Sequence, residues 1–385
     1  MRKICVVITA RPSYSRIRSA LKAIQDHPEL ELQLVVCASA LLERYGSAVQ
    51  QIKKDGFPIQ AQVYMVLEGE NLASMAKTTG IGLMELTTVF DNLKPDAVVS
   101  VADRYETIAT AIAAAYMNIP LAHIQGGEIT GSIDEKVRHA VTKLSDLHLV
   151  SSQAAADRVI RMGEQADRVF VTGCPSIDIA AAVAQNRNLD FDPFKRYGGV
   201  GELDHLNDQG YLVVMQHPVT QEHNLAREQT FKTLHAVHQT GLPVLWFWPN
   251  VDAGSDGTSN AIRTFRETHA CEQFHFFKNM APDDFLRLIC NARCLVGNSS
   301  VGIRECSYLG VPVVNIGTRQ AGRDRGANVL DCAYDTDQIK SAIQRQLDHG
   351  IYACDPFYGD GTAGTKIAEV LARAPLSIDK KLTYS

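Results

Sequence analysis

Residues 123–143 follow a short apolar run and hold a dense group of ionisable side chains: Glu128, Asp134, Glu135, Arg138, His139 and Lys143. The pair Gly126 and Gly127 separates the apolar run from this group. A strand that ends at a glycine pair places the next side chains at the carboxyl edge of a sheet, where open α/β folds bind ligands. Carboxylates and a basic helix face are costly to bring together there unless a bound molecule uses them. We therefore interpret this stretch as a catalytic centre that moves protons.

Polar residues also follow the first expected strand. Arg11 comes directly after it, and Ser13 or Ser15 is expected to cap the next helix. Backbone N–H groups at a helix start, together with a guanidinium, suit a phosphate oxygen. An ordinary capped helix with a solvated arginine explains the pattern equally well.

A polar triplet, Asp103, Arg104 and Glu106, follows the third expected strand. Such a triplet at the start of a helix is usually a cap. We favour a shared site because Gln125 and Glu128 end the adjacent strand.

The second half of the chain repeats this arrangement. His217 stands at a strand end before a proline, where a structural histidine and one that meets a ligand are equally plausible. Asn250 ends the next strand and is placed like a ligand contact, whereas Trp246 and Trp248 are expected in the core.

The sharpest phosphate signal is the segment 297–305, in which a strand runs into small hydroxyl residues that open a helix. Backbone N–H groups and the hydroxyls of Ser299 and Ser300 can face one point there, and a diphosphate fits without lysine or metal. Glu305, one turn further on, can accept hydrogen bonds from ribose hydroxyls. Arg319 and further arginines after the last strand indicate an anion pocket, with a solvated loop as the rival explanation.

Composition limits the function classes. The chain has 385 residues, 45% apolar and 21% charged residues, and a formal net charge of −5, which suit a soluble two-domain protein and argue against nucleic-acid or anionic-membrane partners. Its nine cysteines are scattered without a CxxC motif, so we expect reduced thiols and no zinc site. Because the sequence shows no metal-ligand cluster and no nicotinamide-binding fingerprint after the first expected strand, we expect no metal and no obligate cofactor. Apolar segments are too short for a signal peptide or a membrane span, and the cytoplasm is the expected location.

Short β-branched runs alternate with helix-period stretches, which predicts an α/β fold with parallel sheets. Eleven strands are expected, at residues 4–9, 32–37, 97–101, 121–124, 147–151, 169–172, 211–216, 243–248, 274–277, 293–296 and 311–316. We place the domains at residues 1–173, 174–360 and 361–385, where the last segment holds a helix at 365–372 and a frayed tail. The glycine-rich segment 198–201 is expected to be a plain loop.

These residues resemble the UDP-N-acetylglucosamine 2-epimerase family, and most closely its hydrolysing branch, which begins sialic and legionaminic acid biosynthesis. The matching segments span nearly the whole chain in one order: 11–15, 103–104, 123–128, 133–135, 138–139, 217–218, 249–250, 297–300, 304–305 and 317–320. The resemblance implies two Rossmann-like domains that face a central cleft (the GT-B arrangement), with a C-terminal helix that crosses back to the first domain. It also implies a homo-oligomer, a dimer or a tetramer.

Roles for individual residues also come from the resemblance. The UDP-sugar would be bound by Arg11, Ser15, Arg104, Gln125, Arg138, Asn250, Ser299, Ser300, Glu305 and Arg319, and the catalytic residues would be Asp103, Glu128, Asp134 and His217. Non-hydrolysing relatives typically show Ala-Gly-Leu-Arg after position 125, so Gly126, Gly127 and Glu128 indicate the hydrolysing branch. Many hydrolysing members carry glutamate where Gln125 stands, and an amide cannot take up a proton.

The implied reaction eliminates UDP from UDP-GlcNAc, or from a 2,4-diacetamido analogue, and then adds water to the glycal to release the free 2-epimer. Asp103 and Asp134 are candidates for base and acid, and the sequence does not assign one role to each. A non-hydrolysing epimerase, a GT-B glycosyltransferase and a non-catalytic nucleotide-sugar sensor are the alternatives. The glycosyltransferase ranks lower because three acidic positions exceed the single base it needs.

Overall fold

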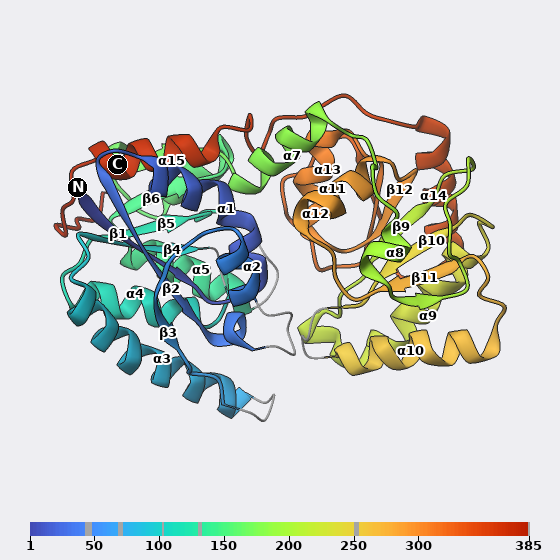
Figure 1. Ribbon diagram of the computed structural model, residues 1–385, viewed down its shortest axis with the longest axis horizontal. Coiled ribbons are helices and arrows are strands. Elements are labelled where there is room, and N and C mark those ends of the chain that lie inside the picture. Colours follow the sequence, from blue (N-terminus) through green and yellow to red (C-terminus); the bar gives the residue numbers. More distant parts are fainter. Residues whose placement is uncertain (43–47, 68–71, 102–103, 130–132, 250–253, 384–385) are drawn as a thin grey trace. The chain divides into compact units, whose positions relative to one another are not determined.

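The computed structural model describes residues 1–42, 48–67, 72–101, 104–129, 133–249 and 254–383, with the backbone alone at residues 11, 72, 133, 134 and 220. The chain divides into two compact units (Figure 1). The first holds Met1–Ile129, Ile133–Asp178 and the C-terminal residues from Tyr358, and the second holds Ile179–Phe357. The first unit is therefore built from both ends of the chain.

The sheet of the first unit is parallel, with seven strands in the order β3-β2-β1-β4-β5-β6-β7. The strands are β1 (Arg2–Ile8), β2 (Leu30–Cys37), β3 (Ile59–Val63), β4 (Ala97–Val101), β5 (Leu121–Ile124), β6 (Leu147–Val150) and β7 (Val169–Val171). All five residues of β4 are buried, as expected for a strand covered on both faces.

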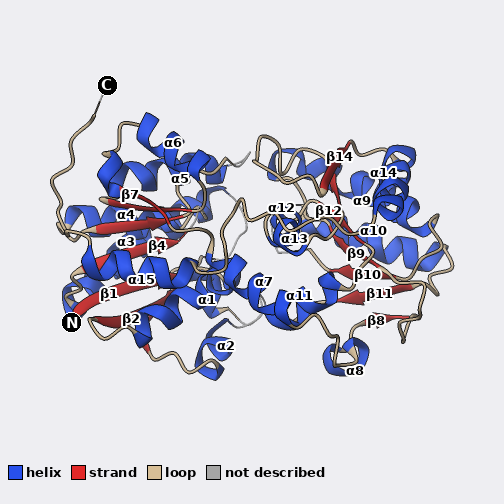
Figure 2. Ribbon diagram, turned by 90° about the horizontal axis from the view of Figure 1, so that it is seen from above, coloured by secondary structure: helices blue, strands red, loops and turns tan. Residues whose placement is uncertain are grey.

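Helices cover both faces of this sheet (Figure 2). They are α1 (Arg11–Asp26), α2 (Ala48–Lys54), α3 (Leu72–Leu93), α4 (Thr107–Tyr116), α5 (Ile133–Leu144), α6 (Gln153–Arg161) and α15 (Ala363–Arg373). A further helix, α7 (Pro175–Gln185), begins in the first unit, and its residues from Ile179 onward pack in the core of the second unit. Alternate residues of β1 enter two separate cores: Ile4 and Val6 join α1 and α15, whereas Cys5 and Val7 join α3 and α4. This is the α/β/α layering of a Rossmann-like domain.

The second unit also has a seven-stranded sheet, in the order β14-β13-β12-β9-β10-β11-β8, parallel except that β8 runs antiparallel to β11. Its strands are β8 (Val200–Gly201), β9 (Leu212–Met215), β10 (Val244–Phe247), β11 (Phe274–Phe277), β12 (Cys294–Gly297), β13 (Val313–Ile316) and β14 (Val329–Cys332). Its helices are α8 (Pro193–Tyr197), α9 (Ala226–His238), α10 (Ser255–Thr268), α11 (Pro282–Cys290), α12 (Ser300–Ile303), α13 (Glu305–Leu309) and α14 (Thr336–His349).

All eleven expected strands are present, and the expected helix near residue 365 is α15. Three strands were missed: β3, β8 and β14. The expectation of a plain loop at 198–201 is wrong, because Val200 and Gly201 pair with β11. Only a glycine fits at 201, since an added Cβ would lie 2.3 Å from the Phe274 carbonyl oxygen.

The C-terminal helix α15 packs on α1 within the first unit, where Gly364 lies against the backbone of Ser19. Asp178 accepts hydrogen bonds from the N–H groups of Ala363 (2.9 Å) and Gly364 (2.7 Å), and so caps α15. This contact links the first turn of α7 to the first unit, and the units divide after Asp178. The sequence analysis placed the end of the first domain at residue 173.

Candidate active site

The turn after β5 leads to Glu128, and it places this residue beside the end of β6. Gln125 adopts a left-handed backbone conformation (φ +67°), and its N–H donates to the Leu149 carbonyl oxygen at 3.0 Å. Gly127 has φ +74°, and an added Cβ would lie 2.3 Å from the Ala155 carbonyl oxygen of α6. The glycine is therefore required because the turn packs directly on a helix backbone.

Glu128 is held between two strand ends and a helix. Its side chain is buried, and Ser151, which follows β6, donates a hydrogen bond to its Oε1 at 2.7 Å. The fully buried Arg138 of α5 donates to the Glu128 carbonyl oxygen at 2.9 Å. Glu128 and Arg138 were predicted to belong to one site, and the structure brings these two residues into contact. Ser151 was missed as a partner, although it too stands directly after an expected strand.

The Gln125 side chain contacts the segment that follows β7. Its Nε2 donates to Sγ of Cys174 at 2.8 Å, and that sulfur lies 3.1 Å from Oγ of Ser176. Cys174 was not predicted as a neighbour of the site, because the sequence does not show that β7 lies next to β6. The hydrogen bond between Gln125 and Cys174 joins the turn after β5 to the segment after β7.

The residues after β4 are also held in place by hydrogen bonds to one another. Glu106 is buried, and its Oε1 accepts a hydrogen bond from Nε of Arg104 at 2.8 Å. The Thr107 hydroxyl donates to the Arg104 carbonyl oxygen at 2.6 Å. The Glu106 side chain caps no helical N–H in the described part of α4, so it is not the cap that a polar triplet usually provides.

Some predicted site residues fall outside the described residues: Asp103 and Asn250 entirely, and Arg11 and Asp134 in their side chains. Arg11 is the first residue of α1, and Asp134 is the second residue of α5. The expectation that Ser13 or Ser15 caps the first helix is wrong, because the helix begins earlier, with Ala10 at its N-cap. Pro12 explains the early start, since proline suits the first helical turn. Ser15 is half-buried in α1.

In the second unit, β9 and β12 are neighbours, and their ends are joined through Asn298. Its side chain accepts from the His217 N–H at 2.7 Å and donates to the His217 carbonyl oxygen at 2.8 Å and the Tyr334 hydroxyl at 3.1 Å. Gly297 makes the approach possible, since an added Cβ would lie 2.1 Å from the Met215 carbonyl oxygen. The histidine predicted after β9 is thus positioned by its backbone.

The predicted phosphate segment follows directly. Ser299 is the N-cap of α12, and its hydroxyl accepts from the Val301 N–H at 3.4 Å. The four-residue helix α12 ends at Ile303, and Glu305, which is buried, begins α13 after Arg304. Arg319 comes back from the end of β13 and donates to the Asn298 carbonyl oxygen at 3.1 Å. A guanidinium beside a serine-capped helix start makes this corner favourable for an anion.

Within the described residues, no group of histidine, cysteine and acidic side chains is arranged to hold a metal ion. Burial raises the pKa of the Cys294 thiol, and also raises the pKa of the Cys290 thiol to about 11, so both are ordinary protonated thiols at neutral pH. In the same described part of the chain, no helix is long and apolar enough to cross a membrane.

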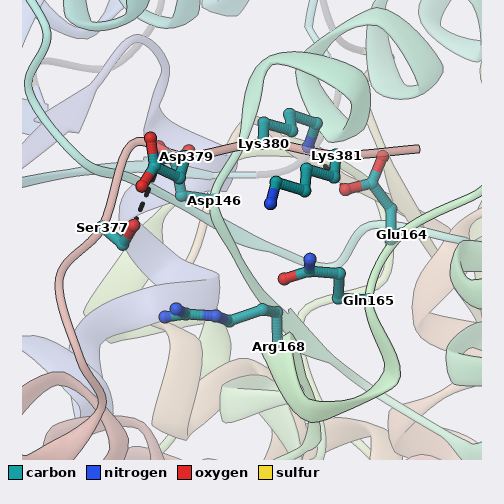
Figure 3. Close-up of a pocket in the computed structure, with 8 residues that line it drawn as sticks. All are labelled: Asp146, Glu164, Gln165, Arg168, Ser377, Asp379, Lys380 and Lys381. Atoms are coloured by element: carbon teal, nitrogen blue, oxygen red, sulfur yellow. Dashed lines mark hydrogen bonds and ion pairs between the residues drawn. The ribbon is translucent and has the colours of Figure 1, made fainter. Parts of the chain in front are cut away.

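A separate polar pocket lies at the opposite edge of the first sheet. Figure 3 shows its lining residues: Asp146, Glu164, Gln165, Arg168, Ser377, Asp379, Lys380 and Lys381. Asp146 precedes β6 and Arg168 precedes β7, so the pocket lies at the amino ends of the strands. Lys380 donates to the buried Glu164 carboxylate and to the Ser145 carbonyl oxygen. The expectation of a frayed tail is wrong for the residues around Lys380, because a buried carboxylate holds them.

Comparison with solved structures defines the fold class. A Neisseria meningitidis UDP-GlcNAc 2-epimerase solved with UDP-GlcNAc has a TM-score of 0.79 at 17% identity, covering 96% of this chain and 99% of that one. A Methanocaldococcus jannaschii UDP-GlcNAc 2-epimerase solved with UDP-GlcNAc and UDP has a TM-score of 0.77 at 16% identity, covering 96% and 99%. The chain has the GT-B fold, and the predicted fold class of two Rossmann-like domains is confirmed.

The sequence itself gives the family. The profile described as UDP-N-acetylglucosamine 2-epimerase matches residues 22–372, so the chain belongs to this family, as its motifs predicted. A Legionella pneumophila UDP-N,N'-diacetylbacillosamine 2-epimerase (hydrolyzing) is 33% identical over 98% of this chain and 97% of its own length. A Neisseria meningitidis UDP-N-acetylglucosamine 2-epimerase is 28% identical over 96% and 95%.

Proposed function

We propose that the protein is a hydrolysing 2-epimerase, which converts UDP-GlcNAc or a 2,4-diacetamido analogue and water into UDP and the free 2-epimer, for sialic or legionaminic acid biosynthesis. The observation that carries the proposal is the buried Glu128 carboxylate, held by Ser151 at the carboxyl edge of the first sheet. The relative at 33% identity, whose name specifies a hydrolysing reaction, supports the same reading.

The first step is an elimination. A carboxylate of the first unit takes the proton from C2, the C1–O bond breaks with its electron pair moving to the diphosphate, and a C1–C2 double bond forms. The C2 proton is only weakly acidic, so the C1–O bond must be largely broken in the transition state. Stabilisation of the leaving diphosphate is therefore the largest contribution. The start of α12 at Ser299 and Ser300, with Arg319, would supply it.

Water then adds across the double bond. Its hydroxyl joins C1, and a proton is delivered to C2 on the face opposite to the one from which the first proton was removed, so the configuration at C2 is inverted. Asp103, Asp134 and Glu128 are the proposed acid–base residues, each worth about a hundredfold or more in rate. His217, which the Asn298 side chain positions, is proposed to assist departure of the diphosphate.

Incubation of the protein with UDP-GlcNAc, or with its 2,4-diacetamido analogue, in D₂O tests the proposal, with proton NMR to identify the products. We expect UDP and a free 2-epimer that carries deuterium at C2, because the elimination exchanges that proton with solvent. A mixture of two UDP-sugars would identify a non-hydrolysing epimerase. Free sugar of unchanged configuration without deuterium would identify simple hydrolysis. Transfer of the sugar only to an added acceptor would identify a glycosyltransferase, and binding of the UDP-sugar without turnover would identify a sensor.

A Glu128→Gln variant tests the role of this carboxylate. If the variant keeps UDP binding but loses product formation, the reaction depends on Glu128.

A further inference from the structure

Three histidine rings gather around one buried phenylalanine where α9 packs on α10 in the second unit (Figure 1). His235 and His238 lie in the last turn of α9, and His269 is the C-cap of α10. Phe265, which is fully buried, contacts all of them: its ring centroid lies 5.2, 5.7 and 4.1 Å from the three imidazole centroids, in that order. We call these four side chains the histidine joint. Its histidines have no part in the proposed reaction.

The imidazole rings of the joint are also neighbours of one another. The ring centroid of His269 lies 5.1 Å from that of His235 and 6.2 Å from that of His238. All three side chains are partly exposed, so protons from solvent reach the joint. Positive charges at such distances repel each other, whereas neutral rings do not. Full protonation of the joint therefore acts against the packing of α9 on α10.

The joint has no acidic partner. Among the described residues, no carboxylate forms an ion pair with any of its three histidines. Ionisable groups on the elements around the joint are Glu222 and His223 in the helical turn Thr220–Leu225, Arg227, Glu228 and Lys232 on α9, Arg263, Arg266 and Glu267 on α10, Cys271 and Glu272 before β11, and Asp337 and Lys340 on α14.

The nearest of these groups are already engaged elsewhere. Glu228 pairs with Lys232 at 2.8 Å, and Glu222 accepts hydrogen bonds from Gln229 at 2.7 Å and Thr318 at 2.6 Å. The two arginines that lie over aromatic rings beside the joint, Arg227 over Phe231 and Arg266 over Phe276, add positive charge. The surroundings therefore do not compensate a charged imidazole.

Two observations indicate that neutral rings fit the joint better than charged ones. Nδ1 of His238 is buried and has no partner among the described residues, so a charged ring would bury an N–H group without an acceptor. Burial lowers the pKa of His235 below its ordinary value of 6.5, and the charges of His269 and His238 lower it further. The carbonyl groups at the ends of α9 and α10 favour a positive charge, but three imidazoles share them.

We propose that the histidine joint is a pH-sensitive contact, which holds α9 on α10 while its imidazoles are neutral and loosens when they become protonated. A histidine whose pKa is lower in the folded than in the unfolded chain contributes its full stability above pH about 6.5 and loses it as the pH falls. The unfolded chain takes up protons that the folded joint resists, so mild acid should destabilise the second unit. This inference does not depend on the proposed function.

The two tryptophans of the chain allow the second unit to be followed by itself. Trp246 and Trp248 both lie in that unit, so their fluorescence reports its unfolding. Urea unfolding of the full chain is measured between about pH 7.5 and 5.5, where histidines titrate and ordinary carboxylates do not. His148, whose pKa burial also lowers, lies in the first unit and is not detected by this probe.

Two variants remove a titrating ring from the joint, and one matched variant serves as the control. The joint variants are His235→Gln and His238→Gln. The control is His349→Gln, because His349 is an exposed histidine of the same unit whose ring stacks on Tyr352 at a centroid distance of 3.7 Å, outside the joint. Only the change of stability with pH is compared, so a constant loss of stability in a variant does not affect the result.

In the parent, the unfolding equilibrium constant should rise about tenfold per pH unit below pH about 6.5 for each histidine that takes up a proton only on unfolding. Over the same range the rise should be about three- to tenfold smaller in each joint variant, and His349→Gln should match the parent. Equal pH dependence in all four proteins would overturn the inference, and so would a parent whose unfolding constant does not change with pH.

For a joint variant that does not fold, NMR of the histidine rings in the parent supplies a second test. The His235 signal is assigned through its ring contacts with Phe231 and Phe265. It should titrate below pH 6.5, the ordinary pKa of histidine. A His235 ring that titrates at or above this value would overturn the inference, whatever the variants do.

Discussion

The C-terminal tail should be a stabilising part of the first unit, and replacing Lys380 by methionine tests this. Lys380 is one of three donors to the Glu164 carboxylate; the others are Lys143 at 2.6 Å and His148 at 2.9 Å. Burial acts to raise the pKa of the Glu164 carboxyl, but the hydrogen bonds from His148, Lys143 and Lys380 outweigh it and lower the pKa to about 2.

The magnitude follows from that pKa. A carboxyl with an ordinary pKa of 4.5 that titrates at about 2 when folded contributes about 3 kcal/mol to the free energy of unfolding. With three donors sharing that contribution, loss of Lys380 should cost about 1 kcal/mol. The lost bond to Ser145 raises the total to about 1–2 kcal/mol. For a domain of this size, the unfolding temperature then falls by about 2–4 °C for each kcal/mol.

Urea denaturation and calorimetry of Lys380→Met measure the effect, with Lys381→Met as the control because the adjacent lysine lines the same pocket. The depressed pKa means that the contribution of Glu164 is complete above pH about 4.5 and is lost as the pH falls towards about 2. The gap between parent and Lys380→Met should therefore stay constant from neutral pH to about pH 5 and then narrow. Equal effects of the two substitutions, or a gap that widens in acid, would refute the reasoning.

Three further predictions concern the site. Ser151→Ala should lower kcat about 10- to 100-fold while UDP binding by calorimetry is unchanged, because a hydrogen bond to the Glu128 carboxylate is worth about 1.5–3 kcal/mol; unchanged turnover would remove Ser151 from the site. Asn298→Ala should cost about 2–4 kcal/mol in urea denaturation and weaken UDP binding, since three hydrogen bonds at two strand ends are lost. Gly297→Ala should destabilise more than Gly241→Ala in thermal unfolding. Both glycines have positive φ, but only the first meets a carbonyl oxygen, so equal losses would contradict this account.

The sequence predicts the parallel strands of this protein well, because strands buried on both faces are continuous apolar runs. The valines of β4 are an example. The missed strands lie at or next to sheet edges, where burial does not select the side chains. In β3, with sequence IQAQV, only Val63 is fully buried, and in β14, with sequence VLDC, Asp331 is exposed.

The positions of candidate site residues were predictable where chemistry-bearing side chains follow a strand, as Glu128 and Ser299 do. Partners supplied by a different strand, such as Ser151 and Cys174, were not. Their role depends on which strands are neighbours, and a single sequence does not show that order. For Glu106, which the sequence analysis grouped with Asp103 and Arg104 in a shared site, the rival interpretation was a helix cap. The structure shows a hydrogen bond from Arg104 and no side-chain cap bond in the described residues.

Because the first unit includes the residues from Tyr358 onward, it cannot be completed until the chain has been synthesised beyond that point. A nascent chain exposes the faces of Ile17 and Leu21 in α1 until α15 arrives to cover them. The main segment of the second unit, Ile179–Phe357, precedes Tyr358 in the sequence and is therefore available to fold earlier. Truncation before α15 therefore acts on the maturation of the unit that carries Glu128, although that residue was made long before.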